Sequence, residues 1–167
     1  MKYNLVCTKV KDIVSSKQEL LILDYFCLDN LVDSYFEKNF NIANSYGYDE
    51  KIMEVDLEVV KKLVHSLMIE LSKILNEEHK INYTIRKWEI LFSFWLHRTI
   101  CVLFNRFKKI EKTFNENSIQ NVTIYKNEIY DLVNYKTNDI GIKSRNLYWN
   151  NIIYDEIIKF KKFRVNM

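Results

Sequence analysis

The hydrophobic residues of this chain form short continuous runs near its N-terminus and follow helical spacing further on. Residues 19–27 form an almost uninterrupted apolar run, a pattern typical of a strand buried on both faces. Residues 3–10, with apolar Leu5, Val6 and Val10, predict a first strand. Residues 40–43 predict a third strand, and residues 121–125 predict a fourth. Strands separated by helical segments indicate βαβ units and a small parallel sheet.

Helices are predicted in the remaining segments. From Asp56, a candidate N-cap, apolar residues recur at helical spacing to about Glu78. Shorter helices are expected over 29–38 and 127–135, and a last helix is expected to run from about residue 146 to residue 163. The segments 45–49, 115–120 and 137–144 are predicted loops.

A second long helix is predicted from Thr84 to about residue 114, and it is apolar on two sides. One side carries Trp88 and Trp95, and the other carries Ile90 and Phe94. A helix that is apolar on two sides is typically buried on both, so we expect it between a sheet and another element, or between two domains.

Length and composition favour one domain over residues 1–167. The chain has 167 residues, of which 48% are hydrophobic, enough for a sizeable core. Gly47 and Gly141 are its two glycines, and proline is absent. A Walker loop or a G-x-G-x-x-G fingerprint needs more glycines than this, so both kinds of phosphate-binding loop are excluded.

Charge and cysteine usage indicate a cytoplasmic protein that does not bind nucleic acid. The net charge is a mild +3, and we read the cluster of Lys108, Lys109 and Lys112 as a solvated helix end. Three widely spaced cysteines form neither a disulfide framework nor a metal site. No signal peptide or transmembrane segment is expected, because charged residues interrupt every apolar stretch.

A line of polar residues at the start of the second long helix is a candidate substrate site. At 100° per residue, Arg86, Glu89 and His97 fall within a sector of about 80°. One interpretation is a cleft lining in which Arg86 binds an anion and Glu89 or His97 acts as acid or base. The other is a structural network, since ion pairs within one helix are common.

Asp24 is a second candidate, because it interrupts the apolar run of the second strand. A carboxylate near the carboxyl end of a parallel strand can orient a sugar or a metal-bound phosphate. The alternative is a capping role for the helix that follows.

Three stretches carry a resemblance to a known family. They are Leu75-Asn76-Glu77 with His79, then Asn82, Tyr83, Arg86 and Trp88 followed by Trp95-Leu96, and finally Trp149-Asn150 with Glu156-Ile157. Their spacing resembles that of a family of transferases from surface-polysaccharide (O-antigen type) biosynthesis clusters. Upstream, Thr8 and Cys27 also match, whereas Asp24-Tyr25-Phe26 replaces the Gly-Glu-Trp of the family.

The resemblance implies a Rossmann-like α/β domain, similar to one half of a two-domain glycosyltransferase. It also implies that the chain corresponds to the N-terminal portion of a longer protein and binds a glycan acceptor or its carrier. No cofactor is expected in this chain, and a nucleotide-sugar donor would belong to a C-terminal domain or a second chain. The alternative is a non-enzymatic protein-interaction module that uses the long two-faced helix.

Overall fold

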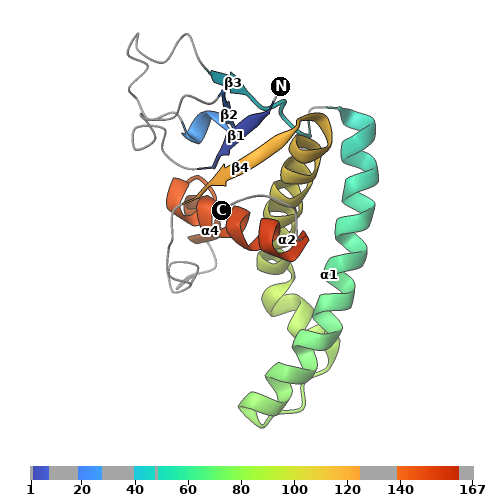
Figure 1. The fold of residues 1–167 in the computed structure, drawn as a ribbon. Coiled ribbons are helices and arrows are strands. Elements are labelled where there is room, and N and C mark those ends of the chain that lie inside the picture. Colours follow the sequence, from blue (N-terminus) through green and yellow to red (C-terminus); the bar gives the residue numbers. More distant parts are fainter. Residues whose placement is uncertain (1, 8–18, 28–39, 48, 125–138, 162–167) are drawn as a thin grey trace. The chain divides into compact units, whose positions relative to one another are not determined.

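The computed structural model describes residues 2–7, 19–27, 40–47, 49–124 and 139–161 (Figure 1). The helices predicted over 29–38 and 127–135 lie outside these ranges. The elements in chain order are β1 (Tyr3–Val6), β2 (Leu20–Ile22), the 3-10 turn η2 (Tyr25–Cys27), β3 (Phe40–Ile42), α1 (Glu50–His79), α2 (Ile85–Glu116), β4 (Ile119–Thr123), α3 (Asp139–Lys143) and α4 (Leu147–Lys161).

The chain divides into two compact units, which are described separately. Unit 1 comprises residues 1–46 and 106–167, and unit 2 comprises residues 47–105. The division falls within α2, whose N-terminal part belongs to unit 2 and whose C-terminal part belongs to unit 1. That residues 1–167 form a single domain stays a prediction.

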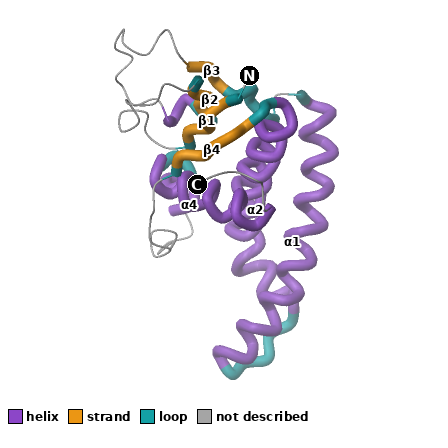
Figure 2. Tube along the Cα trace, in the orientation of Figure 1, coloured by secondary structure: helices purple, strands orange, loops and turns teal. Residues whose placement is uncertain are grey.

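Unit 1 contains a sheet of four parallel strands in the order β3-β2-β1-β4 (Figure 2). Leu5 on the central strand β1 lies opposite Leu21 on β2 and Val122 on β4. This strand order and the flanking helices confirm the predicted small, parallel, Rossmann-like α/β fold. In such a sheet the strand order reverses between β1 and β4, and ligands bind beyond the carboxyl ends of the strands.

The sheet buries both faces, which explains the continuous apolar runs of the sequence. Leu5, Leu21 and Val122 point to one face, where they pack with Ile110 of α2 and Ile158 of α4. The alternate residues of β1 and β2 form a second cluster on the other face. Because successive side chains of a strand point to opposite faces, the central strands β1 and β2 carry apolar residues at successive positions, such as Leu5 and Val6 or Leu21 and Ile22.

The second strand is shorter than predicted. The Leu23 N–H donates to the Val6 carbonyl at 3.0 Å, and the chain then turns, with the Cys27 N–H donating to the Asp24 carbonyl at 2.9 Å. Residues 25–27 form a 3-10 turn, so the prediction of a strand through Cys27 is wrong. The turn leaves Asp24 at the carboxyl edge of the sheet.

Unit 2 begins with α1, whose N-cap is Asp49 and not Asp56 as predicted. The Asp49 side chain accepts hydrogen bonds from the Lys51 and Ile52 N–H groups at 2.9 and 3.4 Å. Its backbone is extended, with φ −92° and ψ 121°, as an N-cap requires. The helix therefore starts about two turns earlier than the apolar periodicity indicates.

The turn between α1 and α2 is held by the side chain of Asn76. Its amide donates to the Tyr83 carbonyl at 2.9 Å and accepts from the Tyr83 N–H at 3.0 Å. The same amide oxygen accepts from the Trp88 indole at 2.9 Å. Trp88 is 4% exposed and packs with Met68 and Leu96 in the core of this unit.

The prediction that α2 is buried on two sides is wrong for its N-terminal part. Ile90 is 72% exposed and Phe94 is 71% exposed, although Trp88 and Leu96 are buried. One apolar side therefore packs against α1, while the other faces solvent.

The last predicted helix is confirmed as α4, and Asn146 caps it by accepting from the Trp149 N–H at 3.1 Å. The segment predicted as a loop around Gly141 contains the short helix α3, so that prediction is wrong over residues 139–143. No helix in the described ranges is both long enough and apolar enough to cross a bilayer.

We expect Asn76→Ala to lower the free energy of unfolding by about 1–2 kcal/mol, because the indole N–H of buried Trp88 and two backbone groups of Tyr83 lose their partner. Urea unfolding followed by tryptophan fluorescence measures this. Glu77→Ala, at the exposed neighbouring position, is the control and changes stability by less than about 0.5 kcal/mol. Equal effects of the two substitutions would contradict the assigned role of Asn76.

Candidate functional site

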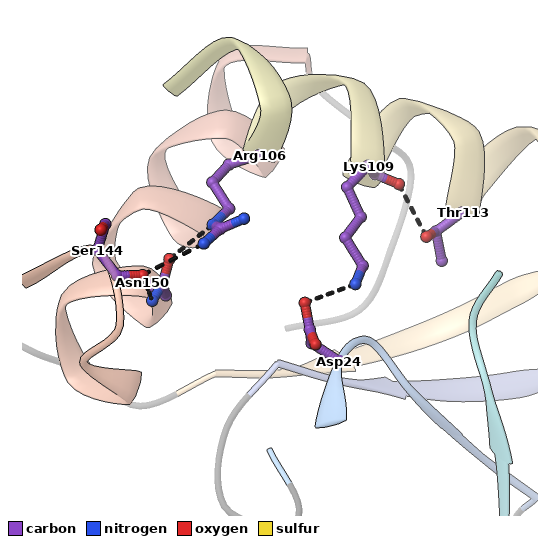
Figure 3. A network of polar contacts seen from close by, with 6 residues as sticks. All are labelled: Asp24, Arg106, Lys109, Thr113, Ser144 and Asn150. Carbon is purple, nitrogen blue, oxygen red and sulfur yellow. Dashed lines mark hydrogen bonds and ion pairs between the residues drawn. The ribbon is translucent and has the colours of Figure 1, made fainter. Parts of the chain in front are cut away.

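The candidate site lies in unit 1, at the carboxyl edge of the parallel sheet. Asp24 follows β2 there, and its Oδ2 lies 2.6 Å from the Nζ of Lys109 on α2 (Figure 3). The two side chains are 15% and 9% exposed. The pair therefore connects the end of a strand to the helix that packs on the sheet.

Burial makes each partner of this pair dependent on the other. Moving either charged side chain from water into this buried position without its partner costs several kcal/mol, and the close contact between the two charges offsets that cost. Thr113, one turn further along α2, donates its hydroxyl to the Lys109 carbonyl at 2.8 Å. Because the Lys109 ammonium group donates to the carboxylate of Asp24, this carboxylate is held in one position.

A second polar contact forms beside this pair. The Nε of Arg106 donates to Oδ1 of Asn150 at 2.7 Å, and a terminal nitrogen donates to the Ser144 carbonyl at 3.2 Å. Asn150 also donates to the Ser144 carbonyl at 2.9 Å. Arg106 therefore holds the start of α4 against α2, and Figure 3 shows it on the same side of the sheet as Lys109.

Two buried thiols and a buried phenol near the pair are neutral at physiological pH. Burial raises the pKa of the Cys7 thiol well above its ordinary value and that of Cys27 to about 12. Burial also raises the pKa of the Tyr154 phenol. Neither thiol is therefore a thiolate nucleophile. Among the described residues, charged side chains near these groups include Asp24, Lys109, Arg106 and Asp155.

The structure brings two of the four predicted site residues together. Arg86 and Glu89 in unit 2 form an ion pair with a separation of 3.3 Å between the terminal nitrogen and the carboxylate oxygen. Their side chains are 79% and 30% exposed. His97 lies on the same helix about 12 Å further along its axis, at 1.5 Å per residue, and is half-buried. Asp24 belongs to unit 1 and is partnered by Lys109.

The sequence interpretation missed Lys109, which was assigned to a solvated helix end. That assignment is wrong, because the Lys109 side chain is 9% exposed. A signal was present in the spacing: Arg106, Lys109, Ile110 and Thr113 recur at the intervals of a buried helix face. Reading that face as continuous would have identified Lys109 and Arg106 as partly buried cations that need partners.

Within the described parts of the chain, no three His, Cys, Asp or Glu side chains gather as metal ligands.

A family of known proteins matches this chain. The family described as LIC12162 family transferase matches residues 3–167, which is nearly the whole chain. No curated protein and no solved structure gives a significant match.

We expect Lys109→Met to lower the free energy of unfolding by about 3–5 kcal/mol, because Asp24 is left charged and buried. Chemical denaturation measures this, and Asp24→Asn combined with Lys109→Met should recover most of the loss. Lys73→Met is the control, since Lys73 and Glu70 form a pair that is 67% and 65% exposed and contributes less than about 1 kcal/mol. An equal loss in both single variants would contradict the buried pair.

The raised thiol pKa values predict a loss of stability at alkaline pH. Above pH 9.0, unfolded thiols release protons that the folded Cys27 retains up to about pH 12, so unfolding becomes easier as pH rises through this window. Denaturation at increasing pH measures this, with Cys27→Ala as the comparison.

A thiol-reactive dye should label the half-buried Cys101 first, and rapid labelling of Cys7 would contradict its burial.

Proposed function

The chain belongs to the LIC12162 family of transferases, and we propose that it acts in the cytoplasm in surface-polysaccharide (O-antigen type) biosynthesis. In this proposal the chain binds the glycan acceptor or its carrier. The nucleotide-sugar donor is left to a C-terminal domain or a second chain.

The observation that carries the proposal is the position of Asp24. It stands at the carboxyl edge of a parallel sheet with the order β3-β2-β1-β4, where ligands of such sheets bind. A carboxylate accepts hydrogen bonds from sugar hydroxyls, and the contact with Lys109 at 2.6 Å holds the carboxylate of Asp24 in place. The absence of a glycine-rich loop from the sequence argues against a dinucleotide at this edge and favours recognition by side chains.

The cations of the edge support a ligand that also carries negative charge. Arg106 lies on the same side of the sheet as Lys109 (Figure 3). The N–H groups of a lysine or an arginine donate hydrogen bonds to phosphate oxygens, so a phosphate on a glycan carrier suits these two residue types. In this proposal the edge combines Asp24, an acceptor for hydroxyl groups, with donors for an anion.

Unit 2 carries proposed binding residues of its own, separately from the sheet edge of unit 1. Arg86 is assigned to an anionic group of the substrate, because its guanidinium is 79% exposed and has five N–H donors. Glu89 and His97 are assigned as acid or base groups. These assignments rest on residue chemistry and on the resemblance, which includes Arg86.

The second candidate function is the non-enzymatic interaction module. One observation favours it, the exposure of Ile90 and Phe94 on α2. The tryptophans of the same helix do not contribute, since Trp88 is buried in the core of unit 2 and Trp95 packs against that core. Ile90→Ser with Phe94→Ser separates the two functions, because acceptor binding at the edge does not need these side chains.

We expect the full chain to bind a short-chain prenyl diphosphate that carries one N-acetylhexosamine, measured by calorimetry. Asp24→Asn should weaken binding about tenfold, because it removes a charged acceptor. Since the substitution also leaves Lys109 without its counter-charge, binding is measured under conditions in which denaturation shows that the variant is folded. Arg86→Ala should weaken binding by a similar factor, about tenfold, without unfolding the protein.

The control is Lys61→Ala, because Lys61 forms an exposed ion pair with Glu58 that matches the Arg86–Glu89 pair in its helical spacing. This variant should bind the probe like the wild type. If the wild type does not bind the probe, or if all three variants bind it equally, the proposed function is wrong.

A further inference from the structure

We propose that one face of α2 docks the chain on an anionic membrane surface. This inference goes beyond the proposed function, because it concerns a surface of unit 2 and needs no ligand at the sheet edge. The side chains that form the face, which we call the basic-flanked face, are Lys87, Ile90, Leu91, Phe94 and Arg98. At 100° per residue they fall within about 100° of the helix circumference.

The centre of this face is apolar and unusually exposed. Ile90, Leu91 and Phe94 are 72%, 57% and 71% exposed, and they are neighbours at helical spacing. Single exposed apolar residues are common on proteins, but a contiguous group marks an interaction surface. The core of unit 2 does not require these residues, because α2 packs against α1 through Trp88 and Leu96.

The two ends of the face are basic. Lys87 precedes the apolar group and Arg98 follows it, and both side chains are exposed. They are separated by about 16 Å along the helix axis, at 1.5 Å per residue. A helix that lies in the plane of a bilayer interface has this arrangement: its apolar side chains enter the acyl boundary while lysine and arginine reach the headgroups.

The charge around the face identifies the sign of its partner. Residues 80–98 contain Lys80, Arg86, Lys87 and Arg98 against the single acid Glu89, which gives 4 − 1 = +3. This equals the net charge of the whole chain, +3. Glu89 lies about 100° around the helix from the nearest member of the face. Anionic headgroups attract such a basic segment, so an anionic lipid surface fits this face better than a neutral one.

Co-sedimentation of the full chain with vesicles tests the proposal. We expect binding to vesicles of equimolar phosphatidylglycerol and phosphatidylcholine, weaker binding to phosphatidylcholine alone, and loss of binding as salt is raised. Ile90→Ser with Phe94→Ser should lower the partition coefficient about tenfold or more, because the inserted side chains are lost.

A matched control exists elsewhere on the chain. Ile142 and Phe160 are 74% and 78% exposed in α3 and α4, so Ile142→Ser with Phe160→Ser removes the same residue types at similar exposure outside the face. Its partition should equal that of the wild type. For the charges, Lys87→Glu with Arg98→Glu should abolish the preference for phosphatidylglycerol, whereas Lys51→Glu with Lys62→Glu, exposed on α1, should retain it.

Three results would overturn the proposal. The first is failure of the wild type to sediment with phosphatidylglycerol vesicles, and the second is equal partition of the two serine double variants. The third is a self-associated wild type that Ile90→Ser with Phe94→Ser converts to a monomer, which would make the face an interface between copies of the chain. Binding of the soluble acceptor probe by the same variants is measured in parallel, so the proposed function is judged separately.

Discussion

The buried ion pair between Asp24 and Lys109 is the interaction on which the organisation of unit 1 depends. It ties the carboxyl end of β2 to the helix that packs over the sheet, at a separation of 2.6 Å. Neither charge is stable in this position without the other. The pair therefore fixes where the strand ends, where α2 lies on the sheet, and where a carboxylate is presented at the edge that parallel sheets use for ligands.

Much of the fold follows from the sequence because its apolar patterns are strong. The runs in β1 and β2 are buried on both faces, and the sheet contains both strands as predicted. The start of α1 could not be read in the same way. Asp49 and Asp56 are both plausible caps by type, and the extended backbone at Asp49 decides between them. Residues 52–55 add about one helical turn, and the apolar side chains of this turn are exposed. They therefore give no helical periodicity of buried positions.

The candidate site was only half visible in the sequence. Asp24 was detectable because it interrupts an apolar run, but its partner is 85 residues away and no local pattern connects them. Lysine is usually exposed, which is why Lys109 was misassigned. The N-terminal part of α2 does carry apolar residues on two sides, as predicted. Sequence spacing alone does not distinguish an apolar face that is buried from one that is exposed, and Ile90 and Phe94 lie on an exposed face.

The residues that carry the family resemblance divide into two kinds in unit 2. Asn76 and Trp88 hold the α1–α2 turn through hydrogen bonds, whereas Arg86 is exposed. In unit 1, the sheet edge at Asp24 is proposed to receive the acceptor. An NMR titration of the full chain with the prenyl diphosphate glycan tests it most directly. We expect the changes in amide chemical shift to concentrate at Leu23, Asp24 and Tyr25, beyond the carboxyl end of β2, with little change at Glu19 and Leu20 at its amino end. Shifts confined to the amino edge, or absent from the sheet, would contradict it.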